Sequence, residues 1–219
     1  MANSITIAVL YIVPVLFAVI AHEVAHGWVA GKLGDPTARL LGRITLNPLP
    51  HIDPIGTIIL PLLLYLTRSP FLFGWAKPVP VNFANLRGGR KDMAMVALSG
   101  PLTNLILAVI SSIIFHLTYF SLLGPSGISQ FWHDWMNEPV REMSFISVRF
   151  NLVLMVINLL PILPLDGGRI VAGLAPAHIA IAMERMERYG MLIVLLLIAS
   201  GIWSYIVSPV VYLFWHILM

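Results

Sequence analysis

Long apolar runs interrupted by few charges are the feature that most constrains how this chain can fold. Several of these runs approach or exceed the roughly 20 residues that an α-helix needs to cross a bilayer. Hydrophobic residues make up 58% of the chain and charged residues only 11%, whereas soluble domains carry roughly 25% charged residues. The sequence therefore predicts an all-α polytopic membrane protein, with residues 1–219 in a single membrane-embedded domain.

About four of the apolar runs are predicted to be spanning helices. They are residues 5–29, 93–120, 144–165 and 190–216. The last run contains Pro209, where we expect a kink. The chain also has 16 Gly and 16 Pro, which are too many for plain spanning helices and indicate broken or re-entrant segments around a cavity.

Two kinds of shorter segment complete the predicted architecture. Residues 54–67 are apolar but short for a span, so we expect a re-entrant or partly inserted hairpin. Residues 43–46 and 77–81 are expected to form short extended strands at the cytoplasmic mouth, because Pro78 and Pro80 exclude helix there. A strand edge at this place could pair with an unwound peptide, although Pro-rich segments are more often loops.

Cysteine is absent, which excludes disulfides, thiolate nucleophiles and cysteine-based zinc sites. Any metal must therefore be held by histidine and carboxylate side chains. The formal net charge of +3 does not indicate a nucleic-acid partner, because the 13 Lys and Arg residues lie scattered beside apolar runs and form no stripe.

His22, Glu23 and His26 form an HExxH pattern near the end of the first predicted helix. Residues four apart share one face of a helix, so the two imidazoles are spaced to bind one zinc ion, with the glutamate beside them. Ionisable side chains inside an apolar span cost about 2.5 to 3.5 kcal/mol each and persist mainly for function. The alternative is that these residues are buried polar groups that bridge helices.

A catalytic zinc ion needs a third protein ligand and an open position for water. Asp166 is the first candidate, because it lies at the proline-unwound end of another apolar run and two glycines follow it, which permit close backbone approach. Asp53 is a weaker candidate, since a carboxylate next to Pro54 suits a turn or a helix cap better. His51 could contact a substrate near the membrane entrance or be a hydrogen-bonded loop histidine.

HEVAH in the first predicted helix, together with NLLPILPLDGG in a later one, resembles the site-2 protease family of intramembrane zinc metalloproteases. The segments GRITLNPLPHIDPIGT, FGWAKPVPVN and SGPLTN are similar to the compact group of that family, which lacks PDZ and CBS sensor domains. The resemblance extends over most of residues 18–170. Within SGPLTN, Asn104 is expected to bond across closely packed helices, with Gly100 allowing the close approach.

The resemblance implies one Zn²⁺ ion per chain, held by His22, His26 and Asp166, with Glu23 as the general base. It also implies that Asn158 lines the site near the scissile carbonyl, where it could donate to the developing oxyanion; a helix-end hydrogen bond is the alternative. The implied activity is hydrolysis of peptide bonds within or near transmembrane segments, known as regulated intramembrane proteolysis. Membrane lipid and single-span membrane proteins are the implied partners, and a regulatory membrane partner is compatible with a protease that has no sensor domain.

The two halves of the metal site and the charge distribution predict the orientation. His22 lies about 26 Å along the first helix, near its exit from a hydrocarbon core about 30 Å thick, and Asp166 must reach the same side, so residues 54–67 cannot cross. One face then holds eleven Lys and Arg residues, whereas Arg141 lies on the other and Arg149 within a span. By the positive-inside rule, we expect a multi-pass plasma (inner) membrane protein whose active site lies toward the cytoplasm.

Two rival functions remain open at this point. A metal-ion transporter would use His22, His26 and Asp166 as a transit site, but it needs ligands that lead to both faces, and residues 5–21 offer none. A non-catalytic membrane protein would keep the metal site without hydrolysis, but metal binding alone does not require Glu23.

Overall fold

Among the described residues, two helices are long and apolar enough to cross a membrane. In the computed structural model, which describes residues 4–68, 74–122 and 137–219, they are α1 (Ser4–Leu33) and α4 (Arg90–Leu122). Their apolar stretches cover Val9–Leu33 and Arg90–Thr118. These two helices include the first two predicted spans and extend beyond both ends of each.

The third long helix, α6, ends where the sequence places its prolines. It covers Glu138–Asn158, so it begins earlier and ends earlier than the predicted span at 144–165. Residues 159–165, which include Pro161 and Pro164, form turns, and the short helix α7 (Asp166–Leu174) starts directly after them. The expected unwinding is confirmed, since a proline inside a helix removes a backbone hydrogen bond and clashes with the preceding turn.

The last predicted span is interrupted at Gly201. Helix α8 covers Ala177–Ala199 and α9 covers Ile202–Leu218. Gly201 has a φ of 73°, in the left-handed region that glycine adopts without steric cost. Pro209, where a kink was expected, lies inside the continuous helix α9. The break is therefore earlier than the sequence indicated.

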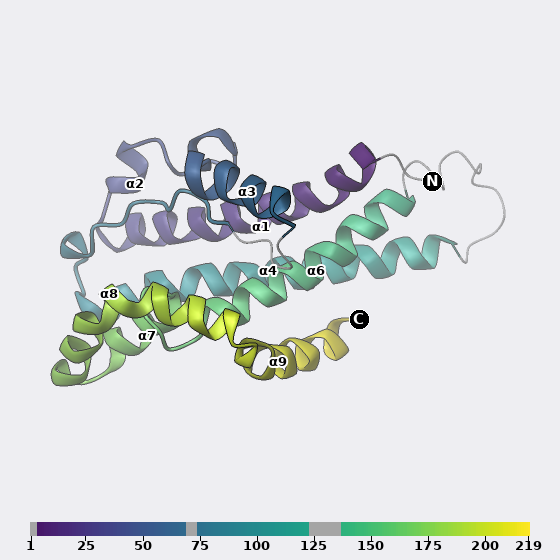
Figure 1. Cartoon of the computed structure of the whole chain (residues 1–219). Helices are drawn as coiled ribbons and strands as arrows, with labels where there is room; N and C mark the ends of the chain where they lie inside the picture. The colour runs from purple at the N-terminus through teal and green to yellow at the C-terminus, as the bar shows by residue number, and fades with distance from the viewer. Residues whose placement is uncertain (1–3, 69–73, 123–136) are drawn as a thin grey trace.

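The long helices pack side by side, with α4 against both α1 and α6 and with α9 along α6 (Figure 1). Three helices supply the buried cluster between them, which consists of Ala108, Val148, Leu152, Met155, Val156 and Val207. Helix α7 packs on the first half of α4 and so brings the start of α7 to α1 and α4. This arrangement places Asp166 beside the HExxH motif.

Residues 54–66 form a short helical segment, and the chain that follows it comes back to the start of this segment. It consists of the π-helical turn η2 (Pro54–Ile59) and α3 (Leu60–Leu66). The chain then returns beside its own start, because the backbone N–H of Trp75 donates to Gly56 O at 3.1 Å and the Thr57 hydroxyl donates to Trp75 O at 2.9 Å. These contacts bring Gly56 and Trp75 together, as the two ends of a hairpin.

Neither of the two predicted strands forms. Among the described residues, 43–46 and 77–81 carry no strand assignment. The side chain of Arg43, not a backbone N–H, donates to Lys77 O at 2.9 Å and to Pro78 O at 3.2 Å. Because Pro78 and Pro80 have no N–H, this stretch cannot supply the regular donors of a ladder. The extended chain is fixed by side chains instead.

Asp35 anchors residues 82–85 to the end of α1. Its side chain is fully buried and accepts from Asn82 N at 2.7 Å, from Asn85 Nδ2 at 2.9 Å and from the Thr37 hydroxyl at the start of α2 (Thr37–Leu40). Burial by itself raises the pKa of Asp35, but the hydrogen bonds from Thr37, Asn85 and Asn82 outweigh it and hold the pKa below its usual range. Residues 75–85, hereafter the strap, are thus pinned alongside α1.

Candidate metal centre

His22 and His26 lie one turn apart on α1 and face each other. Their Nε2 atoms are 3.1 Å apart, and the two ring planes are perpendicular with centroids 4.7 Å apart. His22 is only 7% exposed. The spacing of four residues thus produces the shared face that the sequence predicted.

Asp166 comes to these imidazoles from the first turn of α7. Its Oδ2 lies 3.1 Å from His22 Nε2, and its Oδ1 lies 3.3 Å from His26 Nε2. Gly167 and Gly168 allow this position, because a Cβ on either would overlap the backbone of residues 159–163. The structure therefore brings together the three residues that the resemblance implied, and all three ligand atoms lie within 4.8 Å of one another.

The tautomer of His26 is set by a backbone carbonyl. Its Nδ1 lies 2.8 Å from Val96 O on α4. A carbonyl oxygen can only accept, so Nδ1 must carry the proton in this bond. In the neutral ring, Nε2 then keeps its lone pair and points it at His22 and Asp166.

A chain of two amides sets the tautomer of His22. Asn151 Nδ2 donates to Ser147 O at 2.9 Å, which leaves Asn151 Oδ1 to accept from Asn104 Nδ2 at 2.8 Å. Asn104 Nδ2 also lies 3.3 Å from Ala18 O. Asn104 Oδ1 therefore faces His22 and accepts from its Nδ1 at 2.6 Å. This series of hydrogen bonds begins at the carbonyls of Ser147 and Ala18, which can only accept. Nδ1 of His22 must therefore carry the proton, and its lone pair lies on Nε2.

Three acceptors thus converge with no donor of their own. The Nε2 lone pairs of His22 and His26 meet the Asp166 carboxylate, and Asp166 Oδ2 is buried without a hydrogen-bond donor in the described part of the chain. Such a set is stable only with a shared proton or a cation at its centre. Two imidazoles and one carboxylate, each imidazole held through its second nitrogen, fit the three-ligand pattern of a catalytic zinc site.

Gly100 on α4 makes room for both imidazoles. A Cβ at this position would overlap Cε1 of His22 and Nε2 of His26. The predicted close approach is confirmed, and Asn104, one turn further along α4, bonds across helices as expected. Helix α4 therefore covers the metal centre with one glycine and one amide.

Glu23 is held by the strap. Its Oε2 accepts a hydrogen bond from the backbone N–H of Val79 at 2.8 Å. Gly27, one turn further along α1, lets the strap lie close, because a Cβ there would overlap the side chains of Val79 and Ala38. One oxygen of the glutamate beside the metal ligands is therefore engaged by the peptide backbone.

Three other predicted residues lie outside the three-ligand cluster. Asn158 donates from Nδ2 to Leu154 O at 3.0 Å, which is the helix-end bond given as its alternative. Asp53 accepts from the N–H groups of Ile55 and Gly56 and so caps η2. His51 is buried, with Nε2 2.9 Å from Thr45 O, as a hydrogen-bonded loop histidine.

Sequence reasoning missed Asn151 and the strap's contact with Glu23. Asn151 is a polar residue inside a predicted span, and that position alone was a signal of a specific bond. The contact between Val79 and Glu23 uses a backbone donor 56 residues away, so no residue type at that position indicates it.

Known proteins are similar to the chain over most of its length. The model of peptidase family M50 matches residues 87–201. The Bacillus subtilis (strain 168) protein named "Putative zinc metalloprotease YwhC" is 38% identical over 193 residues, which cover 86% of this chain and 79% of that protein. The Mycolicibacterium smegmatis protein named "Putative zinc metalloprotease Rip2" is 28% identical over 203 residues, or 90% of this chain and 70% of that protein. No solved structure matches the chain.

Proposed function

The chain belongs to peptidase family M50, the site-2 protease family of zinc metalloproteases, and we propose that it cuts other membrane proteins within or near their transmembrane segments. The observation that carries this proposal is the position of the three converging ligand atoms. They meet beside Glu23 of α1, an apolar helix that is long enough to cross a membrane. A peptide bond hydrolysed there would lie inside or at the edge of the bilayer.

We assign His22, His26 and Asp166 as the residues that hold the ion. Zinc, when bound, supplies a Lewis acid that polarises a carbonyl and makes water acidic enough to lose a proton near neutral pH. Glu23 lies next to His22 and is placed to accept that proton and to deliver it to the leaving amine. Asn158 would donate its second Nδ2 hydrogen to the developing oxyanion, while the first stays on Leu154 O.

The strap orients Glu23 in this proposal. Val79 N–H binds Glu23 Oε2 and leaves Oε1 to accept a proton from water. A helical substrate hides its peptide bonds, so it has to unwind before cleavage. The extended strap beside α1 would pair with the unwound peptide through the backbone groups that Arg43, Glu23 and Asp35 leave free.

Four spans are proposed for the membrane arrangement. They are α1, α4, α6 and the end of α8 continued by α9, which run alongside one another in Figure 1. The hairpin at 54–66 enters and leaves on one side, because Trp75 returns to Gly56. Eleven of the 13 Lys and Arg residues then lie on the face of the metal centre, which supports a plasma-membrane protein with its active site toward the cytoplasm.

Single-span membrane proteins are the proposed substrates, membrane lipid is the surrounding partner, and a regulatory membrane protein is a proposed further partner. The test is cleavage of a panel of tagged single-span substrates by purified protein in liposomes. We expect product from the wild type, loss of product with a zinc chelator, and loss of product with Glu23→Gln.

Zinc content separates the alternatives in the same experiment. Glu23→Gln should keep stoichiometric zinc, because Glu23 is not a ligand, whereas His26→Ala should lose it. Cleavage that survives Glu23→Gln would remove Glu23 from the chemistry. Zinc flux into liposomes that survives Glu23→Gln, without cleavage, would favour the transporter instead.

A further inference from the structure

Arg149 is a charged residue of α6 that the metal centre does not use. It is the twelfth residue of a 21-residue helix, and it is exposed. No hydrogen bond or ion pair involves it in the described part of the chain. By contrast, Arg141 near the start of the same helix pairs with Glu138 and Glu142 at 3.4 and 3.7 Å. An unpaired cation at mid-helix in a proposed span is costly and indicates an anionic partner.

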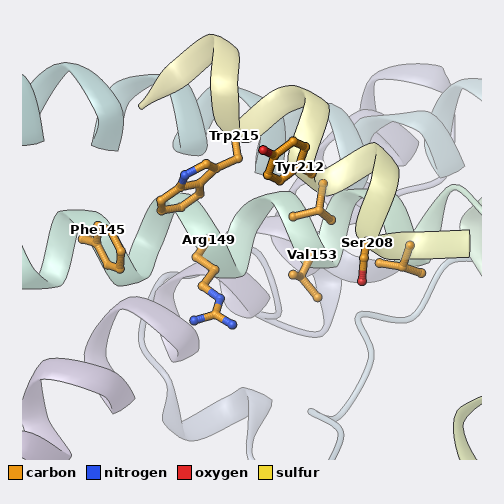
Figure 2. A pocket seen from close by; sticks show the side chains of 8 residues that line it. Phe145, Arg149, Val153, Ser208, Tyr212 and Trp215 are labelled. Carbon is orange, nitrogen blue, oxygen red and sulfur yellow. The ribbon is translucent and has the colours of Figure 1, made fainter. Parts of the chain in front are cut away.

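Arg149 borders a pocket between α6 and α9. The pocket has a volume of 380 Å³. Figure 2 shows Phe145, Arg149 and Val153 on α6, with Ser208, Tyr212 and Trp215 of α9 alongside them. Phe145 and Trp215 pack edge to face with centroids 5.1 Å apart, which gives the pocket one fixed aromatic wall. The lining is therefore apolar apart from one cation, two hydroxyls and the indole N–H of Trp215.

The chemistry of this lining selects an amphiphile with a net negative charge. A guanidinium binds phosphate oxygens through two parallel N–H bonds, and the hydroxyls of Ser208 and Tyr212 offer further donors. The lining contains no carboxylate, so nothing in it would receive the ammonium group of a zwitterionic lipid. The charge therefore favours an anionic headgroup over a zwitterionic one.

The apolar part of the lining suits an acyl chain. Val153, Val207 and Val211 form a continuous hydrocarbon wall beside Arg149, so one ligand can meet the cation with its headgroup and this wall with its chain. The Arg149 side chain extends away from the α6 backbone (Figure 2), and its flexible stem leaves the guanidinium free to meet a phosphate.

We propose that the pocket between α6 and α9 binds a phospholipid with a net negative headgroup, with its phosphate on Arg149 and its acyl chain along Val153, Val207 and Val211. The inference rests on the membrane insertion of α6 and α9 proposed above. Arg149 lies nine residues before Asn158, or about 14 Å along the helix axis, so the lipid does not take part in the chemistry. It joins α6 to α9 from the lipid side.

The test measures lipid binding directly. Purified zinc-loaded protein in detergent is titrated with phosphatidylglycerol or phosphatidylcholine, and retained lipid is counted by native mass spectrometry. We expect the wild type to retain one phosphatidylglycerol, with at least tenfold weaker retention of phosphatidylcholine. Arg149→Gln should need at least tenfold more phosphatidylglycerol, and Arg149→Lys should fall between the two. Arg141→Gln, on the same helix and already paired in the wild type, should bind like the wild type.

Three results would overturn the proposal. The first is unchanged phosphatidylglycerol binding by Arg149→Gln, and the second is equal retention of the two lipids by the wild type. The third is that Arg149→Gln still binds lipid but no longer cleaves a substrate with a transmembrane carboxylate. The last result would make a substrate side chain the partner of Arg149. If Arg149→Gln loses zinc or helical content, Arg149→Lys decides. Because binding is read without turnover, absence of cleavage by the wild type would count against the proposed function and not against this site.

Discussion

Replacing Asn104 by leucine tests whether the amide chain sets the lone pair of His22. The substitution removes the acceptor that lies 2.6 Å from His22 Nδ1 in a fully buried position. An unpaired buried N–H costs about 1 to 3 kcal/mol, and loss of such an outer partner typically weakens metal binding about 10- to 100-fold. The two values agree, because each factor of ten corresponds to about 1.4 kcal/mol. We therefore expect Asn104→Leu to bind zinc about 10- to 100-fold more weakly.

The assay is zinc competition against a chelator of known affinity, together with the visible spectrum of the cobalt-substituted protein. Asn104→Asp keeps an oxygen that faces His22 but loses the bonds that Asn104 Nδ2 donates, so it should bind zinc more tightly than Asn104→Leu and more weakly than the wild type. Ser112→Ala is the matched control. It removes a buried hydrogen bond between α4 and α9, from the Ser112 hydroxyl to Leu218 O, without contact to a metal ligand or to Asn104 and Asn151, so it should leave zinc affinity unchanged.

Two results would refute the reasoning. If Asn104→Leu binds zinc as tightly as the wild type, the hydrogen bond does not position His22. If Ser112→Ala weakens zinc binding as much as Asn104→Leu does, the effect comes from general loosening of the bundle. An altered cobalt spectrum in Asn104→Leu alone would locate the change at the ligand itself.

Three further predictions concern the packing around the centre. Gly100→Ala should reduce zinc content severalfold, because the new Cβ would overlap both imidazoles. Gly31→Ala is the control and should bind zinc normally, because no atom lies within 4 Å of its new Cβ. Asp35→Asn keeps one acceptor oxygen and leaves the Asn82 N–H unpaired, which should cost about 1 to 3 kcal/mol. Folding lowers the pKa of Asp35, so the stabilisation it gives is present above the unfolded pKa of about 4 and is lost as pH falls through the folded pKa. The free energy of unfolding of the variant should therefore lack that decrease between about pH 5 and pH 2. Val79→Pro removes the N–H that holds Glu23 Oε2 and should lower the rate of cleavage without changing zinc content, and an unchanged rate would show that this bond does not orient the general base.

The sequence predicts the membrane class and the metal ligands because both depend on local patterns. Apolar runs of sufficient length set the long helices, and the four-residue spacing of His22 and His26 sets their shared face. The prolines that follow Asn158 end α6 as expected, and the glycines after Asp166 allow its close approach. The predicted strands do not form, since the contacts that hold the strap come from Arg43 and other side chains and not from a ladder.

The sequence by itself determined that this chain is helical, apolar and equipped with two imidazoles, a glutamate and an aspartate suited to zinc. Only the tertiary structure decided which atoms of those residues face one another. The proton positions on His22 and His26 follow from carbonyls of Ser147 and Val96, which lie far away along the chain. A hydrogen bond between distant segments depends on how helices pack, and packing depends on all the side chains together, so no single motif encodes it.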